Sequence, residues 1–414
     1  MATWEGELHG IIIIVGGGIC GLATAVALHR YDYSSLADCI RSLVLERAES
    51  LRATGAGISI HANGWRALDQ LKIGDELRKL AVPLSGMDKR EVHGGRTIVV
   101  VPYRSEVRCL KRSDLVETLA KQLPAGYIRF GCQVEDVSLE PITRFPIVST
   151  SDGSTIKAKQ LVIGCDGAKS VVAKLLSLKA TKYLPTWAAR SLTTYPGGHH
   201  YGNRFQILIG NGINFRLIPI DDKLVCFNAH MSQPPKECIG SKDVNLIQQA
   251  TLQMMQGFPE DVVDLVRRCD ITSLSFTQLC YRAPWHMILE KFHEGMVTVA
   301  GDAMHVMGPF LGQGGSCGLE DAIVLARCLA KTMSSERIND TANDDKKMVK
   351  SVNEGIRLYV KERRWRIVML SLQTFLTGSL NAASSRFRKM FIRAVMVVLF
   401  RSKYRHYNYD CGSL

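Results

Sequence analysis

The chain has 414 residues, of which 46% are hydrophobic and 22% are charged, and it carries a formal net charge of +13. This length gives room for two or three domains with a large buried core, and the composition is that of an ordinary globular protein. No apolar stretch reaches the roughly 18 to 20 residues of a membrane-spanning helix, and the apolar run 11–15 is too short for a signal peptide. No recognisable nucleic-acid-binding module accompanies the positive charge.

The twelve cysteines are scattered, with no C-x-x-C pair and no Cys/His spacing typical of a zinc site. Cys20, Cys165, Cys226 and Cys317 lie inside apolar or glycine-rich runs, where a free thiol packs like a small hydrophobic group. We therefore expect a reduced, cytoplasmic protein without structural disulfides and without a metal site.

The first half of the chain alternates predicted strands and helices, beginning with a βαβ unit. Short apolar or β-branched runs predict buried strands at 11–15, 42–46 and 160–165. Apolar residues at helical spacing predict helices at 22–30, at about 63–80, and from Arg112 onward with Ser113 as the N-cap. A glycine-bearing loop is expected at 54–60.

The pattern changes between about residues 186 and 284. Alternating polar and apolar residues at 205–209 and 214–218 predict strands of a half-exposed antiparallel sheet. Beyond this region a buried strand is expected at 296–300 and a helix at 319–332. The polar stretch 334–350 predicts a surface loop that leads into a helix.

A glycine turn joins the first predicted strand to the first predicted helix, with Gly16, Gly18 and Gly21 in the fixed positions of G-x-G-x-x-G. Gly16 permits a tight turn, Gly18 leaves room for a pyrophosphate, and Gly21 allows the helix to pack closely against the strand. Unpaired N–H groups and the positive end of the helix dipole would bind the phosphates. In this context the motif predicts a dinucleotide site rather than a merely structural turn.

Glu46 ends the second predicted strand, where a carboxylate can accept hydrogen bonds from the ribose hydroxyls of the adenosine half. An acid at this position disfavours a 2′-phosphate, so it favours FAD or NAD over NADP. Glu46 lies farther from Gly16 along the chain than is usual, because residues 32–41 lengthen the connection.

Two further glycine–aspartate motifs lie far along the chain. Asp166-Gly167 ends the apolar run 160–165, and Gly301-Asp302 ends the run 296–300. Together with the glycine turn, and in this order, they resemble the three fingerprints of the FAD-dependent aromatic hydroxylases. A closer resemblance, to the plant branch of the salicylate-hydroxylase-like (group A) monooxygenases, is carried by residues 45–47, 55–58, 63–65, 301–305, 312–315, 319–322 and 408–411.

This resemblance implies an α/β fold with three parts. A Rossmann-like FAD-binding domain of the aromatic-hydroxylase type would comprise residues 1–85, 105–185 and 285–345. An antiparallel β-sheet substrate domain would comprise residues 86–104 and 186–284. The remaining residues, 346–414, would form a C-terminal helical segment.

The resemblance also assigns an FAD site to the motifs and their neighbours. A carboxylate at Asp302 can accept hydrogen bonds from the ribityl hydroxyls, and the following glycines bring backbone N–H groups and a helix N-terminus to the pyrophosphate and the flavin. In addition to Gly16, Gly18, Gly21 and Glu46, the implied FAD contacts are Arg47, Arg52, Gly57, Arg112, Asp166, Gly167, Gly301, Asp302, Gly312, Gly314 and Gly315. The structural alternatives are an ordinary turn residue at Asp166, a helix cap at Asp302 and a solvated arginine at Arg112.

Candidates for catalysis and for substrate binding are less constrained. His61, beside the loop that approaches the flavin in relatives, and His305, in the G-D segment, are the nearest titratable groups, and each is alternatively a structural histidine. The substrate is expected between the flavin and the sheet of residues 186–284. The candidate substrate contacts are Arg216, His230, Pro309 and Phe310, the last two within a segment, 306–316, that is expected to face the flavin ring.

The implied activity is that of an FAD-dependent monooxygenase. NADPH or NADH reduces FAD, and a flavin C4a-hydroperoxide inserts one oxygen atom from O2, by hydroxylation or epoxidation, into a small aromatic or other hydrophobic substrate such as a plant secondary metabolite. The sequence departs from the family pattern at four positions, with Ala173 for Arg, Val306 for Pro, Ser316 for Asn, and Phe310 where plant relatives tend to be polar. The first three raise the alternative of a non-catalytic flavin-binding protein. A second alternative that the sequence leaves open is an FAD-linked reductase or oxidase of the same fold. We expect a monomer or a homodimer, without a nucleic-acid partner.

The last segment of the chain is basic and amphipathic. From Arg366 to Leu414 the only acid is Asp410, and basic residues flank two apolar stretches, 367–380 and 390–400. Such a tail either caps the main body with its Lys and Arg side chains in water, or lies on an anionic membrane as a peripheral contact.

Overall fold

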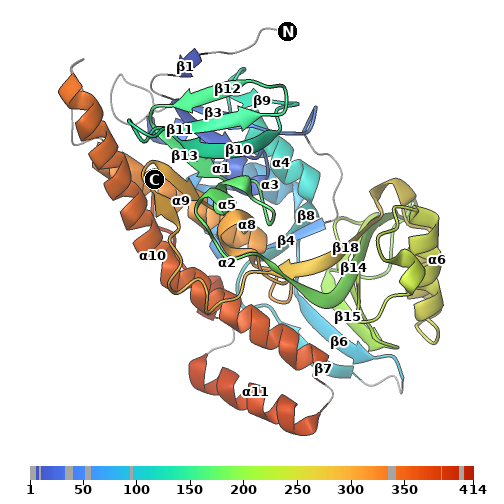
Figure 1. The fold of residues 1–414 in the computed structure, drawn as a ribbon. Helices are drawn as coiled ribbons and strands as arrows, with labels where there is room; N and C mark the ends of the chain where they lie inside the picture. Colours follow the sequence, from blue (N-terminus) through green and yellow to red (C-terminus); the bar gives the residue numbers. More distant parts are fainter. Residues whose placement is uncertain are drawn as a thin grey trace.

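A mostly parallel sheet of short apolar strands lies at the centre of one half of the molecule in the computed structural model (Figure 1). The strand order is β19 (His293–Glu294), β20 (Val297–Val299), β13 (Leu161–Gly164), β2 (Ile11–Val15), β3 (Arg41–Leu45) and β9 (Ile128–Arg129). All neighbours are parallel except β19 and β20. Ile12, Ile13 and Ile14 are fully buried, as expected for strands covered on both faces. The structure describes residues 6–8, 11–32, 41–51, 57–93, 97–333, 342–383, 385–400 and 405–414.

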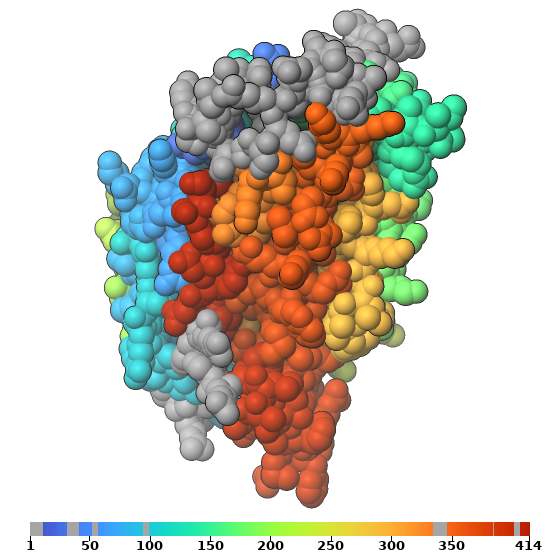
Figure 2. Space-filling view, turned by 90° about the vertical axis from the view of Figure 1, so that its left-hand side faces the viewer, coloured from blue at the N-terminus to red at the C-terminus, as the bar shows by residue number. Residues whose placement is uncertain are grey.

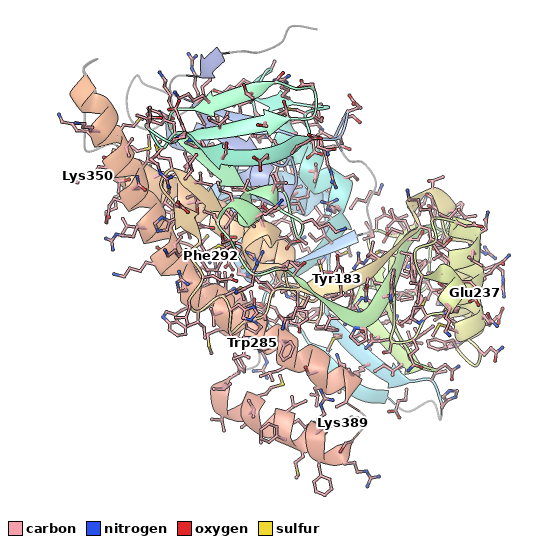
Figure 3. The ribbon with its side chains drawn as sticks, viewed as in Figure 1. Tyr183, Glu237, Trp285, Phe292, Lys350 and Lys389 are labelled. Carbon is pink, nitrogen blue, oxygen red and sulfur yellow. The ribbon has the colours of Figure 1, made fainter. Side chains whose placement is uncertain are left out.

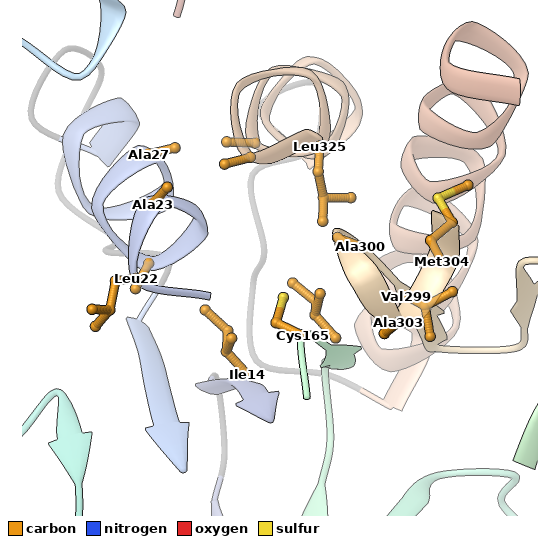
Figure 4. Close-up of a cluster of buried hydrophobic side chains, with 14 of the residues drawn as sticks. Ile14, Leu22, Ala23, Ala27, Cys165, Val299, Ala300, Ala303, Met304 and Leu325 are labelled. Atoms are coloured by element: carbon orange, nitrogen blue, oxygen red, sulfur yellow. The ribbon is translucent and has the colours of Figure 1, made fainter. Parts of the chain in front are cut away.

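Three helices enclose the core of this sheet. α1 (Ile19–Asp32) and α9 (Gly314–Met333) lie side by side, and α10 (Ala342–Ala382) packs along α9. Ala23 and Ala27 present only methyl groups where α1 approaches Leu325 of α9, above Ile14 and Cys165 (Figure 4). These small side chains allow the helices to approach each other and the sheet closely.

Smaller elements complete this half of the molecule. A four-stranded sheet shares the same core and has the order β1 (Gly6–Leu8), β12 (Thr155–Ala158), β11 (Pro146–Thr150) and β10 (Val134–Leu139). A three-stranded sheet has the order β4 (Gly57–His61), β8 (Val107–Lys111) and β5 (Val82–Pro83). The shorter helices are α2 (Ala62–Gln70), α3 (Gly74–Leu80), α4 (Arg112–Lys121), α5 (Val171–Leu175) and α8 (Asp302–His305).

The second half of the molecule is a seven-stranded sheet with its own core. The strand order is β18 (Ser275–Tyr281), β14 (Lys182–Thr194), β17 (Leu224–Met231), β16 (Ile213–Pro219), β15 (Arg204–Gly210), β6 (Gly86–Glu91) and β7 (Thr97–Pro102). All pairs are antiparallel except β15 with β6, so the antiparallel prediction for 205–209 and 214–218 is confirmed. The core contains Phe215 and Phe227 and is shared with α6 (Val244–Met254) and α7 (Glu260–Arg267).

Four local predictions were wrong, the first of them because a contact distant in sequence decides the structure. Residues 57–61 form β4 rather than a loop, because they pair with β8. The helix expected over 63–80 is two helices, α2 and α3, since Lys72 adopts a left-handed φ of 52°. Ser113 is not an N-cap: Lys111 precedes α4, and the Ser113 hydroxyl bonds Asp114. The helix expected at 319–332 begins earlier, at Gly314, so its glycines form the first turn.

The C-terminal part runs along the outside of the molecule and then returns to it. α10 crosses one face, and α11 (Arg386–Leu399) lies below its C-terminal end (Figures 1 and 2). After a 3-10 turn at Arg405–Asn408, Cys411 is buried in the core of the first half. None of the helices that the structure describes combines the length and the apolar character needed to cross a bilayer.

Candidate functional site

A cavity of about 770 Å³ runs from the glycine turn after β2 to the face of the seven-stranded sheet. One end is lined by backbone from the turns after β2, β13 and β20. The other end is lined by apolar side chains, namely Met87, Phe205, Ile207, Ile218 and Phe310. A single space therefore joins the predicted dinucleotide site to the predicted substrate sheet.

The glycine turn has room for a ligand only where the motif requires it. Gly16 has a φ of 105°, and a side chain there would place a Cβ 2.6 Å from the carbonyl oxygen of Cys165. At Gly21 a Cβ would lie 1.9 Å from the carbonyl oxygen of Gly16, so close packing excludes any larger residue. A Cβ at Gly18 would meet no atom within 4 Å, and this backbone lines the cavity at the start of α1. The space left beside Gly18 fits a pyrophosphate at a helix N-terminus.

Glu46 holds this turn in place. Its Oε2 accepts a hydrogen bond of 2.7 Å from the Gly17 N–H, and its Oε1 accepts one of 2.9 Å from the Ala48 N–H. Glu46 as a whole is 6% exposed and still lines the cavity, as does Arg47. Glu46 thus fixes the position of the turn relative to β3 in addition to the ribose contact predicted for it. Arg52 lies outside the described residues.

The G-D motif forms the opposite wall. Gly301 and Gly312 both have positive φ angles, 62° and 63°, and α9 begins at Gly314, so its N–H groups face the same cavity as those of α1. Two helix N-termini that meet at one cavity create a positive potential suited to phosphates and to an anionic flavin.

Asp302 is the carboxylate of this wall. It is open to the cavity but surrounded by protein on its other sides, and this desolvation raises its pKa, although the charges of His305 and Arg112 lower it. Arg112, the first residue of α4, also lines the cavity, as does Gly57. The donor and acceptor set of this wall therefore fits the hydroxyls and phosphates of FAD.

The D-G motif forms a tight turn at the edge of the cavity. Asp166 Oδ2 accepts a hydrogen bond of 2.7 Å from the Val171 N–H at the start of α5, and burial raises the pKa of this carboxyl group. Gly167 has a φ of 83° with open space around it. Asp166, Gly167 and Lys169 line the cavity. Lys169 was not predicted as a site residue, although a lysine two residues after a D-G turn is a signal for an anionic ligand.

His305 does not reach the cavity. It is fully buried, and its Nε2 lies 2.5 Å from Asp321 Oδ2 of α9. Burial opposes its charge, but Cys317 and Asp321 raise the pKa of His305 well above the usual value, so we assign it as a cation paired with Asp321. Of the two histidine candidates, the structure brings only His61 to the cavity.

Asp321 joins three parts of the chain. Besides His305, it accepts a hydrogen bond of 2.8 Å from the Gly301 N–H and one of 2.7 Å from Arg363 Nε of α10. His305 and Arg363 keep the pKa of the buried Asp321 well below its usual value, although burial alone would raise it. His305, Cys317 and Asp321 could offer three metal ligands, but the Arg363 guanidinium already balances this carboxylate and contacts the Cys317 sulfur at 3.2 Å.

Glu320 continues the buried charge network to the C-terminal tail. Its carboxylate accepts hydrogen bonds from Asn63 at 2.6 Å and from Arg366 at 2.8 Å, and forms an ion pair with Arg363 at 2.8 Å. The ring of Tyr409 lies against both guanidinium groups, 4.6 Å from Arg366 and 5.2 Å from Arg363. Sequence reasoning missed this network, although charged residues inside the otherwise apolar helix 319–332 are a recognisable signal.

His61 lies in an aromatic corner of the cavity. Its ring stacks on Tyr407 of the tail at 4.1 Å and meets Tyr103 edge-on at 6.2 Å, and all three residues line the cavity. Burial and the nearby His406 lower the pKa of His61 to about 3. His61 is therefore neutral at physiological pH and can only donate or accept a hydrogen bond there.

The buried His406 makes a pH prediction possible. Burial and the charge of Arg366 lower the pKa of His406 to about 4, whereas an unfolded histidine titrates near 6.5. Between these values the unfolded chain binds a proton that the folded chain does not, so stability falls as the pH drops from about 6.5 to about 4. We expect His406→Gln to weaken this loss by up to about 1.4 kcal/mol per pH unit, as measured by urea unfolding across that range. The exposed His200→Gln is the control, and parallel curves for wild type and His406→Gln would contradict the assignment.

The predicted substrate contacts lie together at the apolar end. Arg216 of β16 is 8% exposed, and its Nη1 donates a hydrogen bond of 3.0 Å to the Pro309 carbonyl. Burial and the charge of Arg190 lower its pKa to about 10. His230 of β17 meets the ring of Phe310 edge-on at 6.4 Å, and burial lowers the pKa of His230 well below the usual value. Alternation alone could not give the orientation of Arg216 and His230; in the structure both line the cavity.

Three of the four departures from the family pattern lie behind the cavity wall rather than in it, and the fourth, Phe310, lines the cavity. Val306 and Ser316 were expected to face the flavin ring, but both are buried and neither lines the cavity, whereas the residues 307–312, 314 and 315 do. Ala173 is buried in α5, where its N–H donates to Ser170 Oγ at 2.9 Å. Val306 is turned inward because it follows the last residue of the short helix α8. Ser316 is turned inward because α9 begins at Gly314, so Ser316 already belongs to its first turn.

Comparison with known proteins agrees with this arrangement. The FAD binding domain family model matches residues 11–195 and 255–352. Monooxygenase 1 of Arabidopsis thaliana is 44% identical over 414 residues, which cover 97% of this chain and 99% of that relative. The match thus extends into the C-terminal segment.

Solved structures share the fold. Klebsiella pneumoniae HpxO complexed with FAD and uric acid matches with a TM-score of 0.75 and 21% identity, over 97% of this chain and 95% of that one. A salicylate hydroxylase substrate complex matches with a TM-score of 0.71 and 22% identity, over 97% and 96% of the two chains. The chain therefore belongs to the FAD binding domain family, as an FAD-dependent monooxygenase of the aromatic-hydroxylase type.

Proposed function

We propose that this protein uses NADPH or NADH to insert one oxygen atom of O2 into a small aromatic or other hydrophobic substrate, such as a plant secondary metabolite. The observation that carries the proposal is the continuous cavity, which has a glycine turn and two helix N-termini at one end and an apolar wall with a buried cation at the other. Bound FAD would supply the electron transfer and the activation of oxygen.

The residues of the chain have three tasks in this proposal. The N-termini of α1 and α9, with Arg112 and Asp302, would hold the phosphates, the ribityl chain and the flavin edge. Met87, Phe205 and Phe310 would exclude water from the reacting centre. His61, which is neutral, would hydrogen-bond the ligand rather than exchange protons with it.

A direct test separates this function from its alternatives. The FAD-loaded protein is mixed with NADPH or NADH and with phenols, indoles or terpenoids, and both hydrogen peroxide and product are measured under ¹⁸O₂. Substrate-dependent incorporation of one ¹⁸O atom is expected. Peroxide as the sole product with every substrate would identify an oxidase, and the absence of NAD(P)H oxidation would favour a flavin-binding protein without this activity.

Arg216 gives the proposal a substrate class. No carboxylate lies within ion-pair distance of Arg216 among the residues that the structure describes, so this buried guanidinium is suited to an anionic group on the substrate. We expect Arg216→Met to raise KM for aromatic carboxylates or phenolates by about 10- to 100-fold, with a much smaller effect on neutral aromatics. Steady-state kinetics with matched charged and neutral substrates measures this difference.

Arg190→Met is the matched control. Arg190 is also a cation whose pKa is lowered by burial; it lies on β14 of the same sheet, separated from β16 by β17, and it does not line the cavity. Its replacement is expected to leave the ratio of the KM values unchanged. An equal change of KM for charged and neutral substrates in Arg216→Met would remove the anionic class from the proposal.

A further inference from the structure

α11 carries an apolar stripe that the rest of the described chain leaves uncovered. Phe387, Met390, Phe391, Val397 and Val398 are 80%, 64%, 70%, 68% and 77% exposed. Phe387, Phe391, Ala394 and Val398 follow one another at helical spacing, so they share one face, with Met390 and Val397 beside it. Only Ile392 of this helix is buried, toward the protein. Contiguous large apolar side chains on a surface indicate an interaction site.

Basic residues border this stripe on both sides. α11 contains Arg386, Arg388, Lys389 and Arg393 and no acidic residue. None of the four forms an ion pair with an acidic side chain in the described part of the chain. By helical geometry, Arg386 and Arg393 lie along one edge of the stripe, and Arg388 lies beyond the other.

The neighbouring sheet adds to this positive charge. Lys89 on β6 has a lowered pKa, first because it is buried and then because of the charge of Arg216. The charges of Arg393 and Lys389 on α11 lower this pKa further, and only Glu91 raises it. Lys389 lies at the end of α11 near β7, and side chains of the helix extend away from the body of the molecule (Figure 3). The same end of the molecule projects in the space-filling view (Figure 2).

We propose that α11 is an interfacial helix that docks the protein onto an anionic lipid bilayer. Phe387, Phe391 and Val398 would enter the boundary between headgroups and acyl chains, and the arginines beside them would bind lipid phosphates. An apolar stripe bordered by cations, on a helix without acids, is complementary to such a surface. A second copy of this chain would bring the same cations together, which disfavours self-association through α11.

The test is vesicle co-sedimentation of the FAD-loaded full chain. Vesicles of phosphatidylcholine with about 30% phosphatidylserine are compared with phosphatidylcholine alone, at low and high salt. We expect the wild type to bind the anionic vesicles and salt to weaken this binding. The variants Lys389→Glu/Arg393→Glu and Phe387→Asp/Phe391→Asp are each expected to partition onto these vesicles at least about ten-fold more weakly. FAD content and thermal unfolding are expected to remain at wild-type values, because these side chains are exposed or lie at the surface.

Two control pairs match these variants in chemistry. Lys236→Glu/Lys242→Glu makes the same change in net charge near Glu237, on the far flank of the molecule (Figure 3). Ile142→Asp/Ile239→Asp replaces exposed apolar side chains elsewhere, which are 92% and 50% exposed. Both controls are expected to bind like the wild type.

The remaining outcomes overturn the proposal. If the wild type bound neutral vesicles as well as anionic ones, the binding would be nonspecific. The same would hold if the two control pairs weakened binding as much as the α11 variants do. A dimer in light scattering that Phe387→Asp/Phe391→Asp converts to a monomer would assign the stripe to a second copy. A monomer that binds no vesicle would also refute docking. Because the assay needs no turnover, its failure is distinguishable from failure of the proposed oxygen insertion.

Discussion

Asp321→Asn is expected to lower the free energy of unfolding by about 3–5 kcal/mol and to release FAD. The carboxylate is fully buried and accepts hydrogen bonds from His305, Arg363 and the Gly301 N–H. Asparagine keeps the shape, but its neutral amide leaves the buried His305 cation without a balancing negative charge and leaves Arg363 with Glu320 alone. The loop before Asp302 would lose its anchor at the same time. Urea unfolding and the flavin absorbance of the purified protein measure the two effects.

Two further variants make this result interpretable. Glu354→Gln removes an acid from an exposed pair with Arg357 and is expected to cause no measurable change. Asp321→Asn/His305→Gln also removes the cation that Asp321→Asn leaves uncompensated. Its loss in the free energy of unfolding should therefore be smaller than the sum of the losses of the two single variants. Strictly additive losses, or an Asp321→Asn protein as stable as the wild type, would contradict a buried charge network.

Gly18→Val is expected to fold normally and to bind FAD at least about 100-fold more weakly, which corresponds to about 2.7 kcal/mol. A Cβ at this position meets no protein atom within 4 Å, so the apoprotein has no clash to accommodate. The same side chain would project into the space beside the N-terminus of α1, where a pyrophosphate is proposed to bind. Titration of the apoprotein with FAD gives the change in Kd.

The matched control is Gly197→Val, in the turn after β14. A Cβ at Gly197 also meets no atom within 4 Å, and Gly197 does not line the cavity. Wild-type FAD affinity is expected for this control, and equal thermal unfolding of all three apoproteins would show that the fold is intact. If Gly18→Val retains stoichiometric FAD, the phosphate site lies elsewhere in the cavity.

The cofactor end of the site was predictable because glycines and aspartates mark it locally. Gly16, Gly18 and Asp302 follow buried strands, and the carboxyl ends of neighbouring parallel strands meet at one edge of a sheet. Strand pairing then brings segments far apart in the sequence to one cavity. Local pattern and topology predicted the glycine turn as a dinucleotide site, and the resemblance to FAD-dependent aromatic hydroxylases added the roles of Asp166 and Asp302.

The substrate end and the supporting network depend on contacts between distant side chains. The sequence indicated that His305 was near the flavin, but not that Asp321 turns it away from the cavity. Tyr407 reaches His61 only because the chain returns after α11. Arg363 and Arg366 lie on α10, where the spacing of apolar residues indicates which face is buried. That spacing does not indicate which acid pairs with each arginine, so Glu320 could not be assigned to them from the sequence.

The return of the tail to the buried charge network has a consequence for biosynthesis. The ribosome synthesises the glycine turn long before β20, Asp321 and the two α10 arginines that contact Tyr409. These later parts of the chain nevertheless form the wall opposite the glycine turn and the buried charge network that supports it. A nascent chain that has only emerged through α5 lacks β20 of the central sheet and one wall of the cradle. Cofactor loading should therefore follow translation of the tail, and during synthesis the exposed edge of β13 would be a natural binding site for chaperones.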